Sequence, residues 1–169
     1  MILRCTRKLI KIFNLTIVED ITSDDNIFSE WYANLIYIEG KKCILFTESK
    51  TLYSILLPDI KKADIIDIGE IFYNQLHKSF LHIGIKEELI IKMVLNPKEI
   101  YYTKTQSMSI LGSMNEYAFQ YKYYFGERGG IKFANIYHII RKVNETPMGQ
   151  IQYNSGNELV KMIFNENFA

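Results

Sequence analysis

The sequence has few of the residues that build metal centres and disulfide frameworks. It contains two cysteines, Cys5 and Cys43, and three histidines among 169 residues. The cysteines form no CxxC pair, and His77 and His82 do not have the spacing of an HExxH helix. We therefore expect no metal site, no cofactor and no disulfide, with both thiols reduced in a cytoplasmic protein.

Long apolar runs are also missing. No window approaches the roughly 18 apolar residues of a membrane-spanning helix, and no apolar run follows the basic N-terminal residues as in a signal peptide. Twenty basic and 19 acidic residues give a formal net charge of +1. This balance gives no general case for a membrane or nucleic-acid partner, although one local basic cluster leaves nucleic acid open: Arg4, Arg7, Lys8 and Lys11.

Motifs that identify common enzyme classes are absent. The sequence contains no P-loop, no GxGxxG dinucleotide fingerprint and no GxSxG nucleophile elbow. Whether the protein is an enzyme therefore stays open.

The chain does have abundant material for a folded core. Its hydrophobic fraction is 48%, and 12 tyrosines and 10 phenylalanines supply much of that fraction. A chain of this length and composition predicts one folded domain over residues 1–169 rather than a disordered chain.

The first third of the chain favours strands. A short strand is expected at residues 2–5, followed by a helix from Arg7 to Phe13 and a polar loop over 19–30. Residues 31–38 and 42–47 are rich in β-branched and aromatic residues and flank Glu39-Gly40, which predicts a hairpin. That turn would pair Ile38 with Lys41, Ile36 with Cys43 and Asn34 with Leu45. A third strand is expected at 51–57.

The rest of the chain favours helices. Apolar residues at helical spacing predict helices over residues 67–82, 107–125 and 133–143, with shorter ones at 86–94 and 157–164 and one turn at 59–64. One further strand is expected at 99–104. Strands gathered early and helices late predict an α+β fold, in which a largely antiparallel sheet of about four or five strands packs against several helices.

The segment from Lys104 to Glu116 combines a strand end with an unusually polar helix start. Ser107 is placed to cap the helix, and Gly112 costs about 1 kcal/mol against alanine in a helix interior. Lys104 and Thr105 would lie near the positive end of the helix, where an anion can bind. The alternative is a capped core helix whose small residues Ser109, Gly112 and Ser113 allow tight packing.

A second candidate is Asn34, which the hairpin places on an apolar face. With Trp31 it could form an aromatic platform with a ligand-reading amide. Alternatively, Asn34 bonds a neighbouring loop within a core strand, as buried amides usually do.

The chain resembles an uncharacterised bacterial family of domains of unknown function. The resemblance rests on stretches spread along nearly the whole sequence, mainly Arg4-Cys5-Thr6, Trp31-Tyr32-Ala33-Asn34-Leu35, Lys42-Cys43-Ile44-Leu45-Phe46-Thr47, Leu111-Gly112-Ser113-Met114-Asn115 and Asn144-Glu145-Thr146-Pro147. It departs from the family pattern at Met108 and Glu145. The family has no assigned activity, so the resemblance implies a shared fold and no function.

These observations lead to one hypothesis and two alternatives. The first is a binding module with one polar pocket for a small anionic or nucleotide-like ligand or a protein partner, built from Arg4, Asn34, Lys104, Thr105, Ser109, Ser113 and Asn115. The second is a small hydrolase or nuclease-like enzyme using Ser109 or Ser113 with Lys104 and Glu116. The third is an interaction or regulatory protein, as a monomer or as a homodimer, with a tyrosine-rich surface at Tyr101, Tyr102, Tyr117, Tyr121, Tyr123 and Tyr124.

Overall fold

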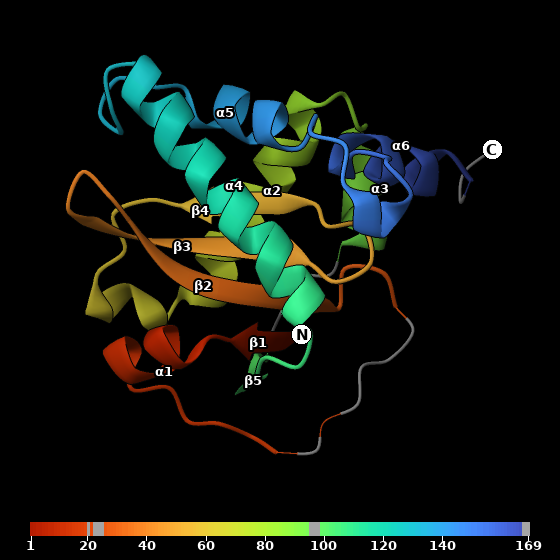
Figure 1. Ribbon diagram of the computed structural model, residues 1–169. Helices are drawn as coiled ribbons and strands as arrows, with labels where there is room; N and C mark the ends of the chain where they lie inside the picture. Colours follow the sequence, from red (N-terminus) through yellow and green to blue (C-terminus); the bar gives the residue numbers. More distant parts are fainter. Residues whose placement is uncertain (20, 22–25, 95–98, 167–169) are drawn as a thin grey trace.

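The computed structural model describes residues 1–19, 21, 26–94 and 99–166, so part of the expected 19–30 loop lies outside the described residues. Figure 1 shows one long helix that crosses in front of part of the sheet. The elements follow in the order β1 (Ile2–Cys5), α1 (Arg7–Phe13), β2 (Glu30–Ile38), β3 (Lys41–Glu48), β4 (Ser54–Leu57), η1 (Lys62–Ile65), α2 (Ile68–His82), α3 (Glu87–Met93), β5 (Tyr101–Lys104), α4 (Met108–Glu127), α5 (Ile136–Val143), η2 (Gly149–Ile151) and α6 (Gly156–Glu166).

The expected α+β architecture is confirmed. The five strands form one mixed sheet in the order β4-β3-β2-β1-β5. The β2–β3 and β3–β4 pairs are antiparallel, whereas β1 runs parallel to both β2 and β5. The sheet is therefore mostly antiparallel, with a parallel part at the β1 end. Parallel neighbours need a crossover connection, and α1 with the segment after it provides the crossover from β1 to β2.

The hairpin register is confirmed residue by residue. Ile38 pairs with Lys41, Ile36 with Cys43 and Asn34 with Leu45. Glu39 and Gly40 form the turn with φ of 52° and 75°, as a two-residue turn matching strand twist requires.

The third strand is shorter than expected, because residues before Ser54 form a turn. Glu48 is buried, and its Oε2 accepts hydrogen bonds from the backbone N–H of Lys50 and Thr51 and from the Thr51 hydroxyl, at 2.9, 2.6 and 2.8 Å. The carboxylate satisfies backbone groups that a strand would have paired, so β4 begins only at Ser54.

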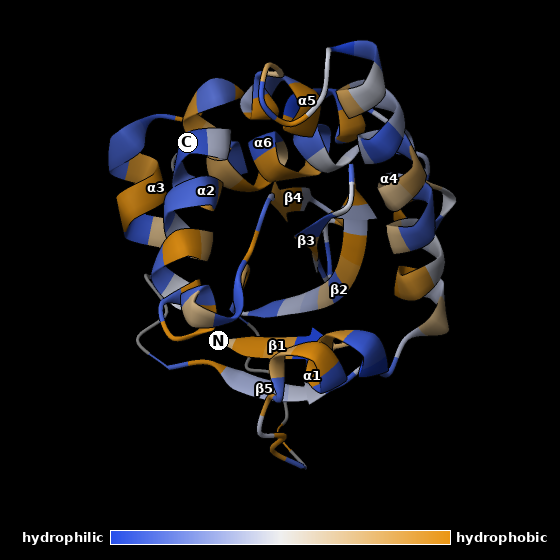
Figure 2. Cartoon of the chain, turned by 90° about the vertical axis from the view of Figure 1, so that its left-hand side faces the viewer, coloured by the Kyte–Doolittle hydropathy of each residue, from blue (hydrophilic) through white to orange (hydrophobic). Residues whose placement is uncertain are grey.

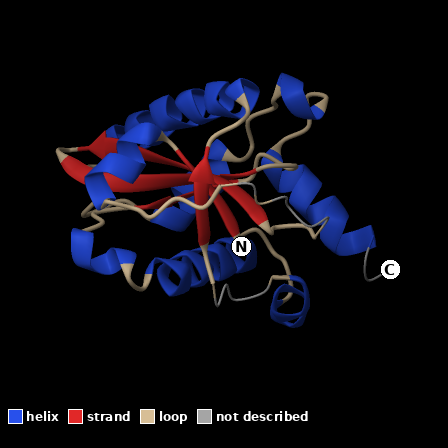
Figure 3. Ribbon diagram, turned by 90° about the horizontal axis from the view of Figure 1, so that it is seen from below, coloured by secondary structure: helices blue, strands red, loops and turns tan. Residues whose placement is uncertain are grey.

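Helices cover both faces of the sheet (Figure 3). Figure 2 shows α2 and α4 on opposite sides of it. Trp31 packs edge-on against Phe72 of α2 with ring centroids 4.9 Å apart, and its indole N–H donates to the Phe28 carbonyl at 2.9 Å. Trp31 is fully buried, so the expected aromatic platform at this residue is wrong: the ring belongs to the core.

Helix α4 packs against the other face through its tyrosines. Tyr117 and Tyr121 are fully buried, and the Tyr121 hydroxyl donates to the Ser54 carbonyl at 3.2 Å. Asn144, after α5, holds the same strand: its Nδ2 donates to the Ser54 carbonyl at 2.6 Å, and its Oδ1 accepts from the Ser54 N–H at 2.6 Å. These bonds fix α4 and α5 relative to β4.

Candidate functional site

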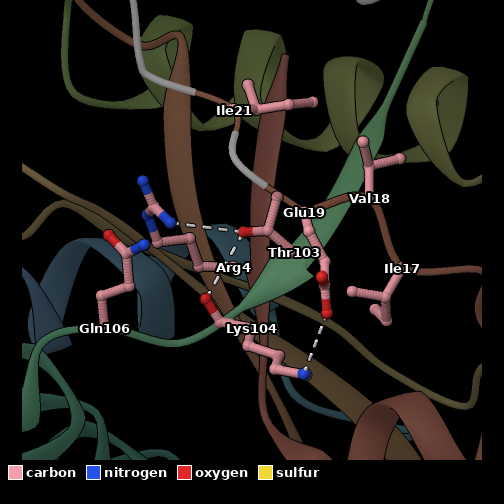
Figure 4. Close-up of a pocket in the computed structure, with 8 residues that line it drawn as sticks. All are labelled: Arg4, Ile17, Val18, Glu19, Ile21, Thr103, Lys104 and Gln106. Atoms are coloured by element: carbon pink, nitrogen blue, oxygen red, sulfur yellow. Dashed lines mark hydrogen bonds and ion pairs between the residues drawn. The ribbon is translucent and has the colours of Figure 1, made fainter.

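A small cavity opens beside β1 and β5 (Figure 4). Its volume is about 140 Å³. Arg4 of β1 lines the cavity, together with three residues from the end of β5 and the following loop, namely Thr103, Lys104 and Gln106. The segment after α1 supplies the other four: Ile17, Val18, Glu19 and Ile21. Two predicted site residues, Arg4 and Lys104, therefore share one cavity.

Arg4 is the most unusual residue of this wall, because it is only 5% exposed. Its Nε donates to the Glu30 carboxylate in an ion pair, and its Nη1 donates to the Thr103 hydroxyl at 3.4 Å. The strand register explains both contacts. Arg4 pairs with Thr103 of β5 on one side and with Tyr32 of β2 on the other, and Glu30 lies two residues before Tyr32. A buried guanidinium needs such partners to offset its desolvation.

Tyr32 connects the Arg4 cluster, which consists of Arg4, Glu30 and Thr103, to the start of α4. The side chain is buried, and burial raises the pKa of its phenol, while the Arg4 guanidinium and the backbone amides of Ser107 and Gln106 act in the opposite direction. Ser107 caps α4 as expected, because its hydroxyl accepts from the Ile110 N–H at 3.2 Å. The positive end of a 20-residue helix therefore lies beside the Arg4 cluster.

Lys104 lies at the outer rim of the cavity. Its Nζ contacts the Glu19 carboxylate at 3.5 Å, with both side chains more than 70% exposed. Such an exposed pair contributes about 0–1 kcal/mol. The neighbouring Val18 N–H donates to the Tyr102 carbonyl at 2.8 Å and holds this segment on β5.

Asn34 lies on the same face of β2 as Tyr32, but it does not line the cavity. Its Oδ1 accepts from the Thr6 hydroxyl at 3.0 Å, and the Thr6 N–H donates to the Ala33 carbonyl at 3.0 Å. The amide therefore ties the start of α1 to β2. This contact is the one expected if Asn34 bonds a neighbouring segment of the protein rather than a ligand.

The predicted residues of α4 point in different directions. Ser109 and Asn115 are exposed, whereas Ser113 is buried. Thr105 is half-buried in the loop before the helix. None of these four lines the cavity. Gly112 is also exposed, and an added Cβ would meet no atom of the described residues within 4 Å, so close packing does not explain this glycine.

A serine nucleophile finds no base in these contacts. The Ser113 hydroxyl is buried and has no hydrogen-bond partner among the described residues. Ser109 is joined to its surroundings through its carbonyl, which accepts from Gln150 at 2.6 Å. The described part of the chain also contains no cluster of three or more His, Cys, Asp or Glu residues that could hold a metal ion.

The expected tyrosine surface divides into buried and exposed residues. Tyr117 and Tyr121 are in the core, Tyr102 and Tyr124 are half-buried, and only Tyr101 and Tyr123 are exposed, at 40% and 55%. Tyrosines at positions 117 and 121 face the sheet because they share the side of α4 that carries Met114 and Phe125.

The sequence did not predict the other residues of the site, among them four polar neighbours of Arg4: Glu30, Tyr32, Thr103 and Gln106. They become neighbours of Arg4 only through the parallel pairing of β1 with β2 and β5. The one available signal was the alternation of Glu30, Tyr32 and Asn34 along a single strand face.

Comparison with known proteins identifies the family and no closer relative. A family model for a domain of unknown function, DUF6933, matches residues 2–159. The chain belongs to the DUF6933 family. The matched span contains every residue of the cavity. No curated protein and no solved structure matches this DUF6933 chain. Among the described residues, no helix is both long enough and apolar enough to cross a bilayer.

Proposed function

We propose that this DUF6933 chain is a binding module that holds a small ligand with an anionic group in the Arg4 cavity. The observation that supports this proposal is the guanidinium of Arg4. Its Nε and Nη1 have protein partners, but its Nη2 has none among the described residues. Nη2 is not a fully buried atom, so it is accessible to solvent and can donate a charge-assisted hydrogen bond to an acceptor that enters the cavity.

Further groups around the cavity suit the same ligand. Thr103 and Gln106 offer a hydroxyl and an amide, and Lys104 adds a cation whose contact with Glu19 is weak enough to exchange. Of the seven residues predicted from the sequence, Arg4 and Lys104 line this cavity. The other five do not: Asn34, Thr105, Ser109, Ser113 and Asn115.

A thermal-shift titration with small anions tests the proposal. At 100 times its Kd, a ligand adds about 2.7 kcal/mol of stability. We expect Lys104→Gln to weaken the response, whereas Lys122→Gln, the same change at an exposed residue of α4 outside the cavity, should leave it unchanged. An equal response from both variants would contradict the proposed site.

A second candidate function is association through the outer face of α4. Met108, Phe119 and Tyr123 are 81%, 69% and 55% exposed along this helix. Large exposed apolar residues on one element favour an interaction surface, and a homodimer is the simplest form of it. Light scattering on the wild type and on Phe119→Glu would test this candidate. A monomer at all concentrations in both proteins would contradict the homodimer.

We also infer a cytoplasmic location. Cys5 and Cys43 are separate free thiols in the core, and burial raises the pKa of the Cys5 thiol to about 12. Unpaired, unreactive thiols suit a reducing compartment.

A further inference from the structure

We infer that the ligand of the Arg4 cavity is a short aliphatic monocarboxylate, with butyrate as the representative probe. This inference rests on the binding function proposed above and names its ligand class. It follows from the size of the cavity, the chemistry of its walls and the balance of charge around it.

The part of a ligand that enters the cavity is limited to a few heavy atoms. The volume of about 140 Å³ is close to that of an engineered protein cavity of about 150 Å³ that binds benzene, a molecule of about six heavy atoms. A four-carbon acid is of this size. A nucleotide is several times larger, so only one end of it could enter.

The lining of the cavity combines polar and aliphatic side chains. Figure 4 shows Arg4, Gln106 and Ile21 on one side of β5, and Ile17, Val18 and the paired ends of Lys104 and Glu19 on the other. A ligand that contacts both kinds of side chain needs a polar head and a short hydrocarbon tail. An inorganic anion would leave the aliphatic side chains facing a charged, hydrated group.

The charges around the cavity favour a single negative charge. Arg4 is paired with Glu30, and Lys104 contacts Glu19, so the formal charges of these four side chains sum to zero. A phosphate dianion would bring two negative charges beside two carboxylates, whereas a carboxylate brings one. The planar carboxylate also matches the planar edge of a guanidinium, and a charge-assisted hydrogen bond is about twice as strong as a neutral one.

The test compares four probes, namely butyrate, its neutral isostere butyramide, inorganic phosphate and adenosine monophosphate, by calorimetry at fixed ionic strength. Butyrate is expected to bind at least about tenfold more tightly than butyramide, a difference of about 1.4 kcal/mol. Gln106→Glu, an exposed change that sets a carboxylate beside the site, is expected to weaken butyrate binding by about tenfold or more. Gln152→Glu makes the same charge change at an exposed residue outside the cavity and should bind as the wild type does.

The outcomes separate the ligand class from the binding function. One outcome is that phosphate or the nucleotide binds, that Gln106→Glu weakens this binding, and that butyrate does not bind. The carboxylate inference is then overturned, and the binding function stands. If butyramide binds as tightly as butyrate, the anionic head is overturned. If none of the four probes binds, or if Gln106→Glu and Gln152→Glu bind alike, both the inference and the proposed site are overturned.

Discussion

Arg4 and Glu30 form a buried ion pair between the parallel strands β1 and β2, with side chains only 7% and 15% exposed. Glu30 lies beside Ile2 in the register, so the arginine reaches back along the strand to meet it. This pair holds the guanidinium in place at the cavity wall while leaving Nη2 without a partner among the described residues.

Breaking this pair from one side is expected to be costly. Glu30→Ala removes the counter-charge of a buried guanidinium and should lower the free energy of unfolding by about 3 kcal/mol, measured in urea. As a control, Lys41→Ala breaks the exposed pair with Asp59, in which both side chains are more than 40% exposed. That change should cost less than about 1 kcal/mol. Equal losses would show that the buried pair has no special role.

Among the asparagines that the structure describes, Asn144 should be the most sensitive to substitution. It is fully buried, and its amide bonds the Ser54 backbone twice and the Ile140 carbonyl once. Asn144→Ala would leave these backbone groups unsatisfied, so we expect a loss of about 3 kcal/mol in urea unfolding. Asn115→Ala, at an exposed helical position, should change stability by less than about 0.5 kcal/mol. A loss below about 1 kcal/mol at Asn144 would contradict its anchoring role.

Glu48 gives the protein a defined pH dependence. Burial raises its pKa above the ordinary value of 4.5, although Thr51 and Lys50 oppose the shift. The folded state therefore binds this proton more tightly than the unfolded state, and the contribution of Glu48 to stability declines as pH rises from 4.5 through the raised pKa. Glu48→Gln stays uncharged, so its stability relative to the wild type should increase over that range in urea unfolding.

Glu158 should behave in the opposite way. Hydrogen bonds from the backbone and side chain of Ser155 lower its pKa, so its contribution is present above 4.5 and is lost as pH falls through the lowered value. The relative stability of Glu158→Gln should therefore decrease as pH rises. The same slope for the two variants would contradict the assignment of these shifts.

Gly112→Ala should stabilise the protein. The glycine is helical and exposed, and an added Cβ meets no described atom within 4 Å. Alanine should therefore raise the free energy of unfolding by about 0.5–1 kcal/mol. Gly130→Ala is the contrasting change, since its φ is +89° and a Cβ would collide with the Glu39 carboxylate. Destabilisation by Gly112→Ala would show that the position is constrained in a way the fold does not explain.

Local patterns predicted most of the elements but not the arrangement of β1. The hairpin register followed from Glu39-Gly40 and from alternation on both sides of it, because both signals lie within 17 neighbouring positions of the chain. The placement of β1 between β2 and β5 depends on packing between segments almost 100 residues apart, as the Arg4–Thr103 contact illustrates. No local pattern encodes that choice.

The candidate site shows the same division. Arg4 and Lys104 stood out as cations at strand ends, and Ser107 as a helix cap. Glu30 and Tyr32 could be recognised only after the parallel register placed them beside Arg4. The sequence predicted that polar residues of α4 belong to the site, but a serine or asparagine on a helix can face solvent or the core. Here Asn115 faces solvent and Ser113 faces the core.

The most direct test of the central claim is a side-chain NMR titration that follows the Arg4 Nε–H resonance as butyrate is added. Binding in the cavity predicts a saturable shift of the Arg4 signal, with no matching shift for Arg7, which is exposed on α1. The shift should weaken in Gln106→Glu and persist in Gln152→Glu. An Arg4 signal that stays unmoved by butyrate and by every other small anion tried would contradict the account.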